Sequence, residues 1–132
     1  MRLYTIAEYI KYRWKAKGRH GTHSPFVYAF IEDFIRKRDG RPFDTKLEAY
    51  FGANNIKWLN NGPASWLQQI ANITPETVIV VPAIHQTKEH TMYWEGLKAT
   101  PATRLSLDLF QYGLLFARDE FKEKQHFILR FP

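Results

Sequence analysis

Cysteine is absent from the 132 residues of this chain. The absence excludes disulfides, thiolate nucleophiles and metal sites that rely on cysteine ligands. The chain also lacks a run of about 20 apolar residues, so the sequence predicts no transmembrane helix. Near the N-terminus, Arg2, Glu8, Lys11 and Arg13 interrupt any apolar stretch, which argues against a signal peptide. The resulting expectation is a cytoplasmic protein.

A glycine-rich nucleotide-binding turn is missing as well. Such a turn needs a G-x-G pattern directly after a strand, so that the backbone can approach a phosphate or a cofactor. Gly18 and Gly21 instead fall between two predicted helices. The sequence therefore offers no cofactor-binding residues of its own, and none are predicted.

Metal-ligating and catalytic patterns are weak. His85 and Glu89 are four residues apart and could share a helix face, whereas His90 would point elsewhere. A zinc site needs three or four convergent ligands, so we interpret His85 and Glu89 as a polar cluster used for capping or surface hydrogen bonds. Asp108 is predicted on the polar face of a strand, where it could pair with an arginine, and no catalytic triad can be assigned.

The composition that is present favours an ordered domain. The chain is 45% hydrophobic and 16% aromatic, which argues against disorder, and its length suits one domain with a substantial core. No linker or internal repeat divides it. We predict a single domain over residues 1–132, with a helical part in 1–52 and an α/β part in 53–132.

Positive charge is concentrated in the first third. Residues 1–41 hold 10 Lys/Arg and 4 Asp/Glu, a net charge of +6, whereas residues 42–132 hold 9 of each. Such asymmetry can mark a surface for nucleic acid or anionic lipid, or it can be a solvated helix face. The candidate interaction surface consists of Lys11, Arg13, Lys15, Lys17 and Arg19.

The first helix carries apolar residues at helical spacing: Leu3, Ala7, Ile10 and Trp14. We expect Ile10 and Trp14 to pack on the sheet while the lysines face water. Two alternatives remain open. Aromatic and basic residues together can bind single-stranded nucleic acid by stacking, and a basic amphipathic helix can lie on a membrane surface.

The second half of the chain predicts a sheet. The run 78–81 is apolar without alternation, as in a strand covered on both faces, and a helix is expected over 87–98. Leucines then alternate with polar residues over 105–109, and Gly113 marks a turn into another strand. The predicted fold is α/β: a small, mainly parallel sheet with a C-terminal antiparallel hairpin and N-terminal helices packed on it.

Two blocks of sequence resemble one protein family, the class I S-adenosylmethionine-dependent methyltransferases of Bacteroidetes. The first block is Arg19-His20-Gly21-Thr22-His23-Ser24-Pro25-Phe26-Val27-Tyr28, similar to the opening of those proteins. The second comprises Leu107-Asp108-Leu109-Phe110, Gly113-Leu114-Leu115-Phe116 and His126-Phe127-Ile128-Leu129-Arg130-Phe131, which resemble their end. Between the blocks, Ile84 and His85 match the end of an Asp-Asp-Ile-His stretch, while Pro82 and Ala83 replace its two acids.

The resemblance implies a partial Rossmann-like methyltransferase fold. It covers roughly residues 1–38 and 56–131, and the family's cofactor-binding half, with its first three strands, has no counterpart here. An intact methyltransferase activity is therefore not expected. S-adenosylmethionine would be a cofactor only if the chain were an enzyme or borrowed a site from a partner chain.

The family's strand order, 3-2-1-4-5-7-6, would leave the strand at 56–59 at the edge of a shortened sheet. An exposed edge invites pairing with another chain, so we predict a homodimer or a partner protein bound near Trp58. The leading functional hypothesis is a non-catalytic interaction or assembly module. The alternatives are a methyltransferase or its subunit, and a basic nucleic-acid-binding module.

Overall fold

A computed structural model describes residues 3–16, 24–71 and 73–131. Helices dominate the first part of the chain and all five strands follow it. The helical elements are α1 (Leu3–Lys15), α2 (Pro25–Phe30), the π-helical turn η2 (Ile31–Ile35), α3 (Phe43–Phe51), the 3-10 turns η3 (Ala53–Asn55) and η4 (Pro63–Ser65), α4 (Trp66–Gln69) and α5 (Lys88–Ala99). The strands are β1 (Ile56–Trp58), β2 (Val78–Pro82), β3 (Leu105–Asp108), β4 (Tyr112–Phe116) and β5 (Gln125–Ile128).

Local sequence accounts for several element ends. Ser24 caps α2 by accepting a hydrogen bond from the Val27 amide, and Pro25 occupies the first helical position. Thr87 caps α5 in the same way through the His90 amide. Gly52 ends α3 at a φ of +91°, a left-handed backbone conformation that favours glycine.

The sheet has the order β1-β2-β4-β3-β5. β1 is parallel to β2, and β5 is parallel to β3, whereas β4 is antiparallel to both of its neighbours. Four strands therefore run in one direction and β4 runs against them. This confirms the small α/β sheet and the antiparallel hairpin, formed by β3 and β4, and it places β1 at one edge.

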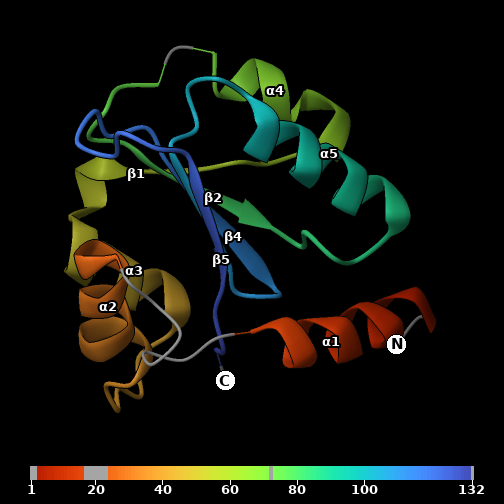
Figure 1. The fold of residues 1–132 in the computed structure, drawn as a ribbon, viewed down its shortest axis with the longest axis horizontal. Helices are drawn as coiled ribbons and strands as arrows, with labels where there is room; N and C mark the ends of the chain where they lie inside the picture. The colour runs from red at the N-terminus through yellow and green to blue at the C-terminus, as the bar shows by residue number, and fades with distance from the viewer. Residues whose placement is uncertain (1–2, 17–23, 72, 132) are drawn as a thin grey trace.

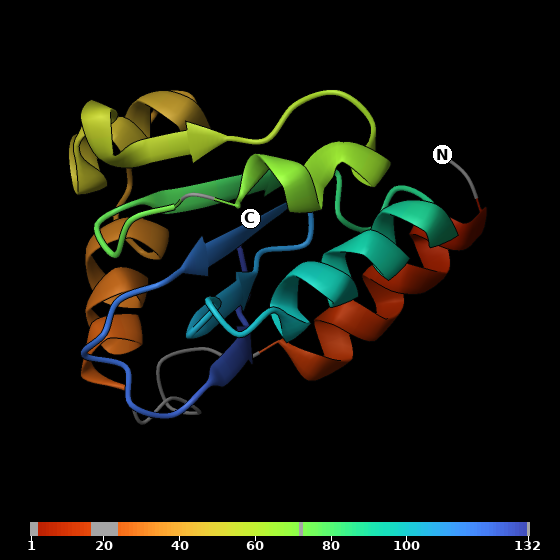
Figure 2. The same ribbon diagram turned by 90° about the horizontal axis from the view of Figure 1, so that it is seen from above.

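Helices cover both faces of the sheet (Figure 1 and Figure 2). On one face, α2, η2 and α3 pack an aromatic-rich core that includes Val27, Phe30, Phe34 and Leu47. On the other face, α4 and α5 pack a second core around Trp66 and Trp94. Burial on both sides explains the uninterrupted apolar sequence of β2.

Gly113 in β4 is required by the second core. A Cβ atom at this position would lie 2.4 Å from the ring of Trp94, so only glycine leaves room for the fully buried indole against the strand.

The strand β3 differs from expectation. Its leucines and polar residues alternate, which predicted one polar face, but all four residues are buried. Ser106 and Asp108 are 2% and 3% exposed, because α5 and α1 cover the side of the sheet to which they point. Buried polar groups need hydrogen-bond partners, and the partner of Asp108 is His85 in the candidate site.

Candidate functional site

His85 is held between two carboxylates. It lies in the turn between β2 and α5, and its Nε2 atom is 2.6 Å from Oδ2 of Asp108, the last residue of β3. Its Nδ1 atom is 3.1 Å from Oε1 of Glu8 in α1. All three side chains are buried or nearly so, with His85 12% exposed. We call Glu8, His85 and Asp108 the His85 clamp, since it joins α1 to the carboxyl ends of β2 and β3.

Further polar contacts hold both carboxylates. The Phe110 amide donates to Oδ1 of Asp108 at 2.8 Å. The Tyr4 hydroxyl lies 3.2 Å from Oε1 of Glu8, and Lys11 forms an ion pair with Oε2 at 3.4 Å. Each carboxylate therefore keeps a second partner besides the imidazole, which orients it toward His85.

The two carboxylates favour a charged imidazole. Burial lowers the pKa of His85, but the hydrogen bond and negative charge of Asp108, together with the charge of Glu8, outweigh that effect and raise the pKa above its usual 6.5. A doubly protonated ring donates to both carboxylates at once, whereas a neutral ring has only one N–H to donate.

Strained backbone surrounds the clamp. Ala83 and Phe110 have φ angles of +57° and +69°, a region that costs residues other than glycine on the order of 1 kcal/mol. Phe110 also stacks on the His85 ring, with centroids 5.3 Å apart. The two turns that end β2 and β3 thus adopt unfavourable conformations that bring the imidazole, its carboxylate and an aromatic ring together.

A cavity of about 170 Å³ opens beside the clamp, lined by its three residues and by Lys98 and His126, among others. His126 contrasts with His85, because burial and the neighbouring charge of Lys98 lower its pKa below 6.5. This volume suits a few water molecules or a small ion, and it is below the range typical of cofactor pockets. On the other side of His85, a more open hollow of about 370 Å³ extends past Phe110 to Tyr112.

Helix α1 is attached through polar groups and through a small apolar cluster in which Tyr12 and the adjacent Ala16 pack with Phe110. Thr5 donates to the Gln86 carbonyl at 3.0 Å, and the Tyr4 hydroxyl donates to Thr91 at 2.7 Å. The Tyr12 hydroxyl donates to the Leu129 carbonyl and accepts from the Phe131 amide. Burial raises the pKa of Tyr12 to about 12, which keeps the hydroxyl protonated and able to donate. Glu8 and Tyr12 are the buried residues of this helix.

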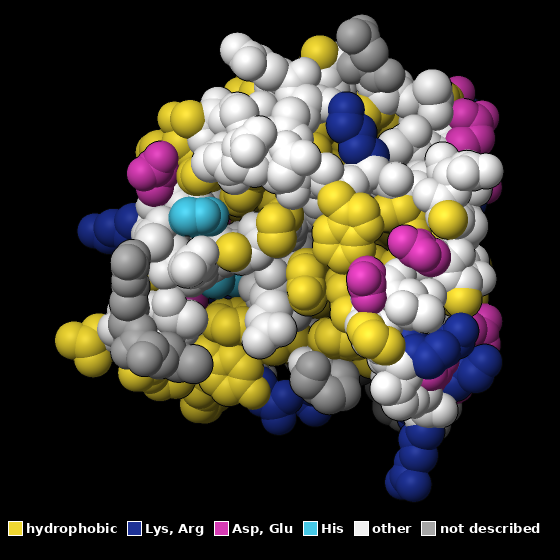
Figure 3. All heavy atoms as spheres, turned by 180° about the vertical axis from the view of Figure 1, so that it is seen from behind, with side chains coloured by type: hydrophobic (Ala, Val, Ile, Leu, Met, Phe, Trp, Pro, Cys, Tyr) yellow, Lys and Arg dark blue, Asp and Glu magenta, His cyan; other side chains and the backbone are white. Residues whose placement is uncertain are grey.

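The apolar side of α1 consequently faces solvent, contrary to the expectation that Ile10 and Trp14 pack on the sheet. Leu3 is 84% exposed, Ile6 41%, Ile10 54% and Trp14 86%. We call these four residues the outer stripe. In Figure 3 exposed apolar side chains gather at the lower left, over this helix. The physical reason for the reversal is that the carboxyl ends of β2 and β3 offer polar partners, which the Tyr4–Glu8–Tyr12 side can satisfy and the apolar side cannot.

The other predicted site residues fall in different places. Lys11, Arg13 and Lys15 are exposed on α1, whereas Lys17 and Arg19 lie outside the described residues. Trp58 is half-buried and packs edge-on against Phe43 and Tyr112. Glu89 is exposed in the first turn of α5, and no hydrogen bond joins it to His85 in the part of the chain that the structure describes.

Two residues of the clamp were not assigned to it from the sequence. Asp108 was interpreted from the sequence as a residue that could pair with an arginine, and it pairs with His85. Glu8 fits a capping box after Thr5, but α1 begins at Leu3 and Glu8 is used in a tertiary contact. The available signal was the position of Asp108 and His85, each close to the end of a predicted strand in a mainly parallel sheet, where the strand ends meet.

Within residues 3–16, 24–71 and 73–131, no group of three or more histidine, aspartate or glutamate side chains has a geometry suited to a metal ion. None of the helices in these ranges has the length and apolar content that a membrane crossing requires. Comparisons with protein-family models, with curated proteins and with solved structures found no match to this chain.

Proposed function

We propose that this chain is a non-catalytic interaction module whose contact surface is the outer face of α1. The observation that carries the proposal is the orientation of that helix: its polar side is bound to α5, to the turn after β2 and to the segment after β5, and its outer stripe faces solvent. Large exposed apolar side chains grouped on one element are typical of interaction sites rather than of an ordinary solvated face.

The His85 clamp supports a structural role for the polar cluster. A general base needs a ring nitrogen that is free to take a proton from a substrate. Both nitrogens of His85 already contact carboxylates, and Glu8 belongs to α1 itself. The clamp therefore orients α1, and in doing so it determines which side of the helix is presented.

A methyltransferase relationship is the second candidate, and the sheet topology favours it. The order β1-β2-β4-β3, with β4 antiparallel between two parallel strands, corresponds to the 4-5-7-6 portion of the order implied by the resemblance. Ile84 and His85, the positions matching the family's Ile-His pair, follow the carboxyl end of β2, and His85 is the central residue of the clamp. These features support common descent, and they carry no cofactor site.

Pairing of two copies at the sheet edge stays a prediction. β1 lies at that edge but spans three residues, so it offers few backbone hydrogen bonds to another strand. The side chain of Trp58 is already packed against Phe43 and Tyr112. The outer stripe is therefore the better-supported contact surface.

The proposal is tested by asking whether the outer stripe is accessible in solution. Trp14 is the tryptophan whose side chain is exposed, since Trp66 and Trp94 are buried and Trp58 is half-buried. We expect acrylamide to quench a large part of the fluorescence of the whole protein, and the Trp14→Phe variant to lose that part. Equal quenching of both proteins would mean that Trp14 is covered, and the proposal would fail.

Calorimetric titration with S-adenosylmethionine and S-adenosylhomocysteine tests the second candidate. The interaction module predicts no heat of binding up to millimolar ligand. Micromolar affinity would instead place an enzymatic role first. Light scattering on the same sample reports whether copies associate.

A further inference from the structure

The outer face of α1 has a specific geometry. Successive residues lie about 100° apart around an α-helix, so Ile6, Ile10, Leu3, Trp14 and Ala7 follow one another within an arc of roughly 100°. All five are exposed. The opposite side, with Tyr4, Thr5, Glu8 and Tyr12, is bound to α5, to the turn after β2 and to the segment after β5. The arc is thus continuous, apolar and directed away from the body of the protein.

Basic residues flank this arc on both sides. On the same helical projection, Arg13 lies about 20° beyond Ile6, and Lys11 lies about 40° beyond Ala7, followed by Lys15. All three are exposed. The one acidic residue of α1, Glu8, is buried and paired with His85. The face that α1 presents therefore combines apolar side chains with positive charge and contains no exposed carboxylate of its own.

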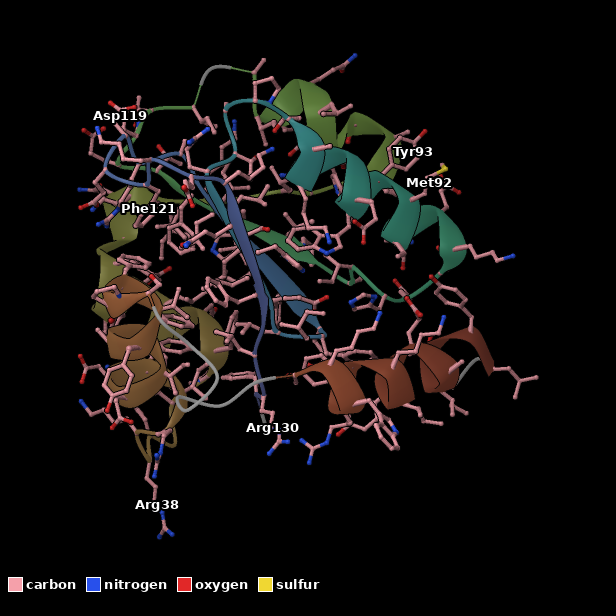
Figure 4. The ribbon with its side chains drawn as sticks, in the orientation of Figure 1. Arg38, Met92, Tyr93, Asp119, Phe121 and Arg130 are labelled. Carbon is pink, nitrogen blue, oxygen red and sulfur yellow. The ribbon has the colours of Figure 1, made fainter. Side chains whose placement is uncertain are left out.

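Two arginines from other elements extend the same side of the molecule. Figure 4 shows Arg38, which follows η2, and Arg130, which follows β5, both extending from the lower side, along which α1 runs. Arg130 projects near the C-terminal end of α1. Positive charge thus continues beyond the helix.

This combination discriminates between kinds of partner. A nucleic acid would contact the basic residues through its phosphates and the aromatic rings through stacking of its exposed nucleobases. It offers no apolar surface for Leu3, Ile6 and Ile10. An anionic lipid surface matches both features of the helix. Its acyl chains accept the apolar arc, and its headgroups attract the flanking basic residues. Trp14 at the arc matches the preference of tryptophan for the boundary between acyl chains and headgroups.

We propose that α1 attaches this protein to the surface of membranes that contain anionic lipid, with the outer stripe entering the interface and Arg13, Lys11 and Lys15 contacting headgroups. The inference rests on the proposed function, since it names the partner of the same surface. The attachment is peripheral and parallel to the membrane plane, with the sheet above it, because the His85 clamp fixes the helix along the body of the protein.

Vesicle sedimentation with the whole protein tests the proposal. Vesicles of phosphatidylcholine alone are compared with vesicles of phosphatidylcholine and phosphatidylserine in equal parts. We expect the protein to sediment with the phosphatidylserine vesicles and the emission of Trp14 to shift to shorter wavelength. Replacement of Ile6 and Ile10 by Gln, or of Arg13 and Lys15 by Gln, should weaken binding at least about tenfold in each case.

Matched controls change the same chemistry elsewhere. Met92 is 61% exposed on α5, and Figure 4 shows it pointing outward at a distance from α1, so Met92→Gln removes an exposed apolar side chain without touching the outer stripe. Replacement of Lys88 and Lys122 by Gln removes two exposed charges. Both controls should bind vesicles as the unchanged protein does.

Several outcomes would overturn the proposal. Unchanged binding after the Ile6 and Ile10 replacements would exclude the outer stripe, and equal binding to both vesicle types would exclude a role for lipid charge. Binding of a single-stranded oligonucleotide that depends on Arg13 and Lys15 but not on Ile6 and Ile10 would assign the surface to nucleic acid. If Trp14 is accessible to acrylamide but no vesicle binds, lipid is excluded while the interaction module stands.

Discussion

Helix α1 and the unit formed by α2, η2 and α3 both come from the N-terminal part of the chain, yet they contact the sheet in opposite ways. The α2–η2–α3 unit buries its apolar side chains: Phe30 and Phe34 stack at 4.8 Å, and both are almost fully inaccessible. α1 buries a carboxylate and a tyrosine hydroxyl and leaves its apolar side in solvent. The difference teaches that an apolar stripe identifies one side of a helix without identifying its partner.

The two attachments also differ in their energetics. The α2–η2–α3 unit gains its stability from the area of apolar surface removed from water, which depends little on direction or pH. α1 gains its stability from a small apolar cluster of Tyr12, Ala16 and Phe110 and from a few directional polar contacts, each worth about 1 kcal/mol or somewhat more when charged. Salt, pH and single substitutions should therefore affect α1 selectively.

The largest expected effect comes from breaking the apolar attachment. Phe30→Ala removes a fully buried ring from the core between α2 and the sheet, and it should lower the free energy of unfolding by about 3–5 kcal/mol. Urea denaturation followed by circular dichroism measures the change. A loss below about 1 kcal/mol would mean that this helical unit contributes little to the folded state.

A smaller effect is expected from breaking the polar attachment. Asp108→Asn preserves the shape of the side chain and the hydrogen bond from the Phe110 amide, but it removes the charge that faces His85. The free energy of unfolding should fall by about 1–3 kcal/mol, and amide exchange should accelerate mainly in α1. Asp119→Asn is the matched control, since Asp119 is exposed in the loop after β4, as Figure 4 shows. Uniform acceleration across the sheet would contradict a local role for the clamp.

Changing the pH should separate His85, beside α1, from His126 in the largely exposed strand β5. The pKa of His85 is raised in the fold, so its contribution to stability is complete below 6.5 and is lost as the pH rises through the folded-state value. The pKa of His126 is lowered, so its contribution is complete above 6.5 and is lost as the pH falls through the folded-state value. The free energy of unfolding should be measured across this pH range. Compared with the unchanged protein, His85→Gln should lose less stability as the pH rises, and His126→Gln should lose less stability as the pH falls. Identical pH profiles for the two variants would refute the assignment.

The smallest effect is expected on the outer face of α1. Trp14→Ala removes the largest exposed side chain of the helix, and the free energy of unfolding should change by no more than about 0.5 kcal/mol. A comparable replacement in α2 would remove several times that amount. Loss of more than about 1 kcal/mol from Trp14→Ala would show that the ring packs on the folded chain.

Much of the fold could be predicted because its signals are local. Ser24-Pro25 and Thr87 mark helix starts, Gly52 marks a helix end, and the apolar run at 78–81 predicts a strand covered on both faces. The candidate site could not be predicted in the same way. His85 contacts Glu8 and Asp108, which are 77 and 23 residues away in the sequence. Sequence periodicity does not predict contacts between residues so far apart. The orientation of α1 was predicted wrongly for the same reason, since its partners are distant in sequence.

The attachment of Tyr12 to Leu129 and Phe131 spans 117 and 119 residues, which has a consequence for protein synthesis. The ribosome releases α1 long before it makes the strand end that receives Tyr12. Until residues 85–91 have been made, none of the side-chain partners of Tyr4, Thr5 and Glu8 exists, and the α1 segment is a cationic, apolar peptide without its final contacts. A membrane or a chaperone can therefore meet this segment first, while the rest of the chain is still being translated.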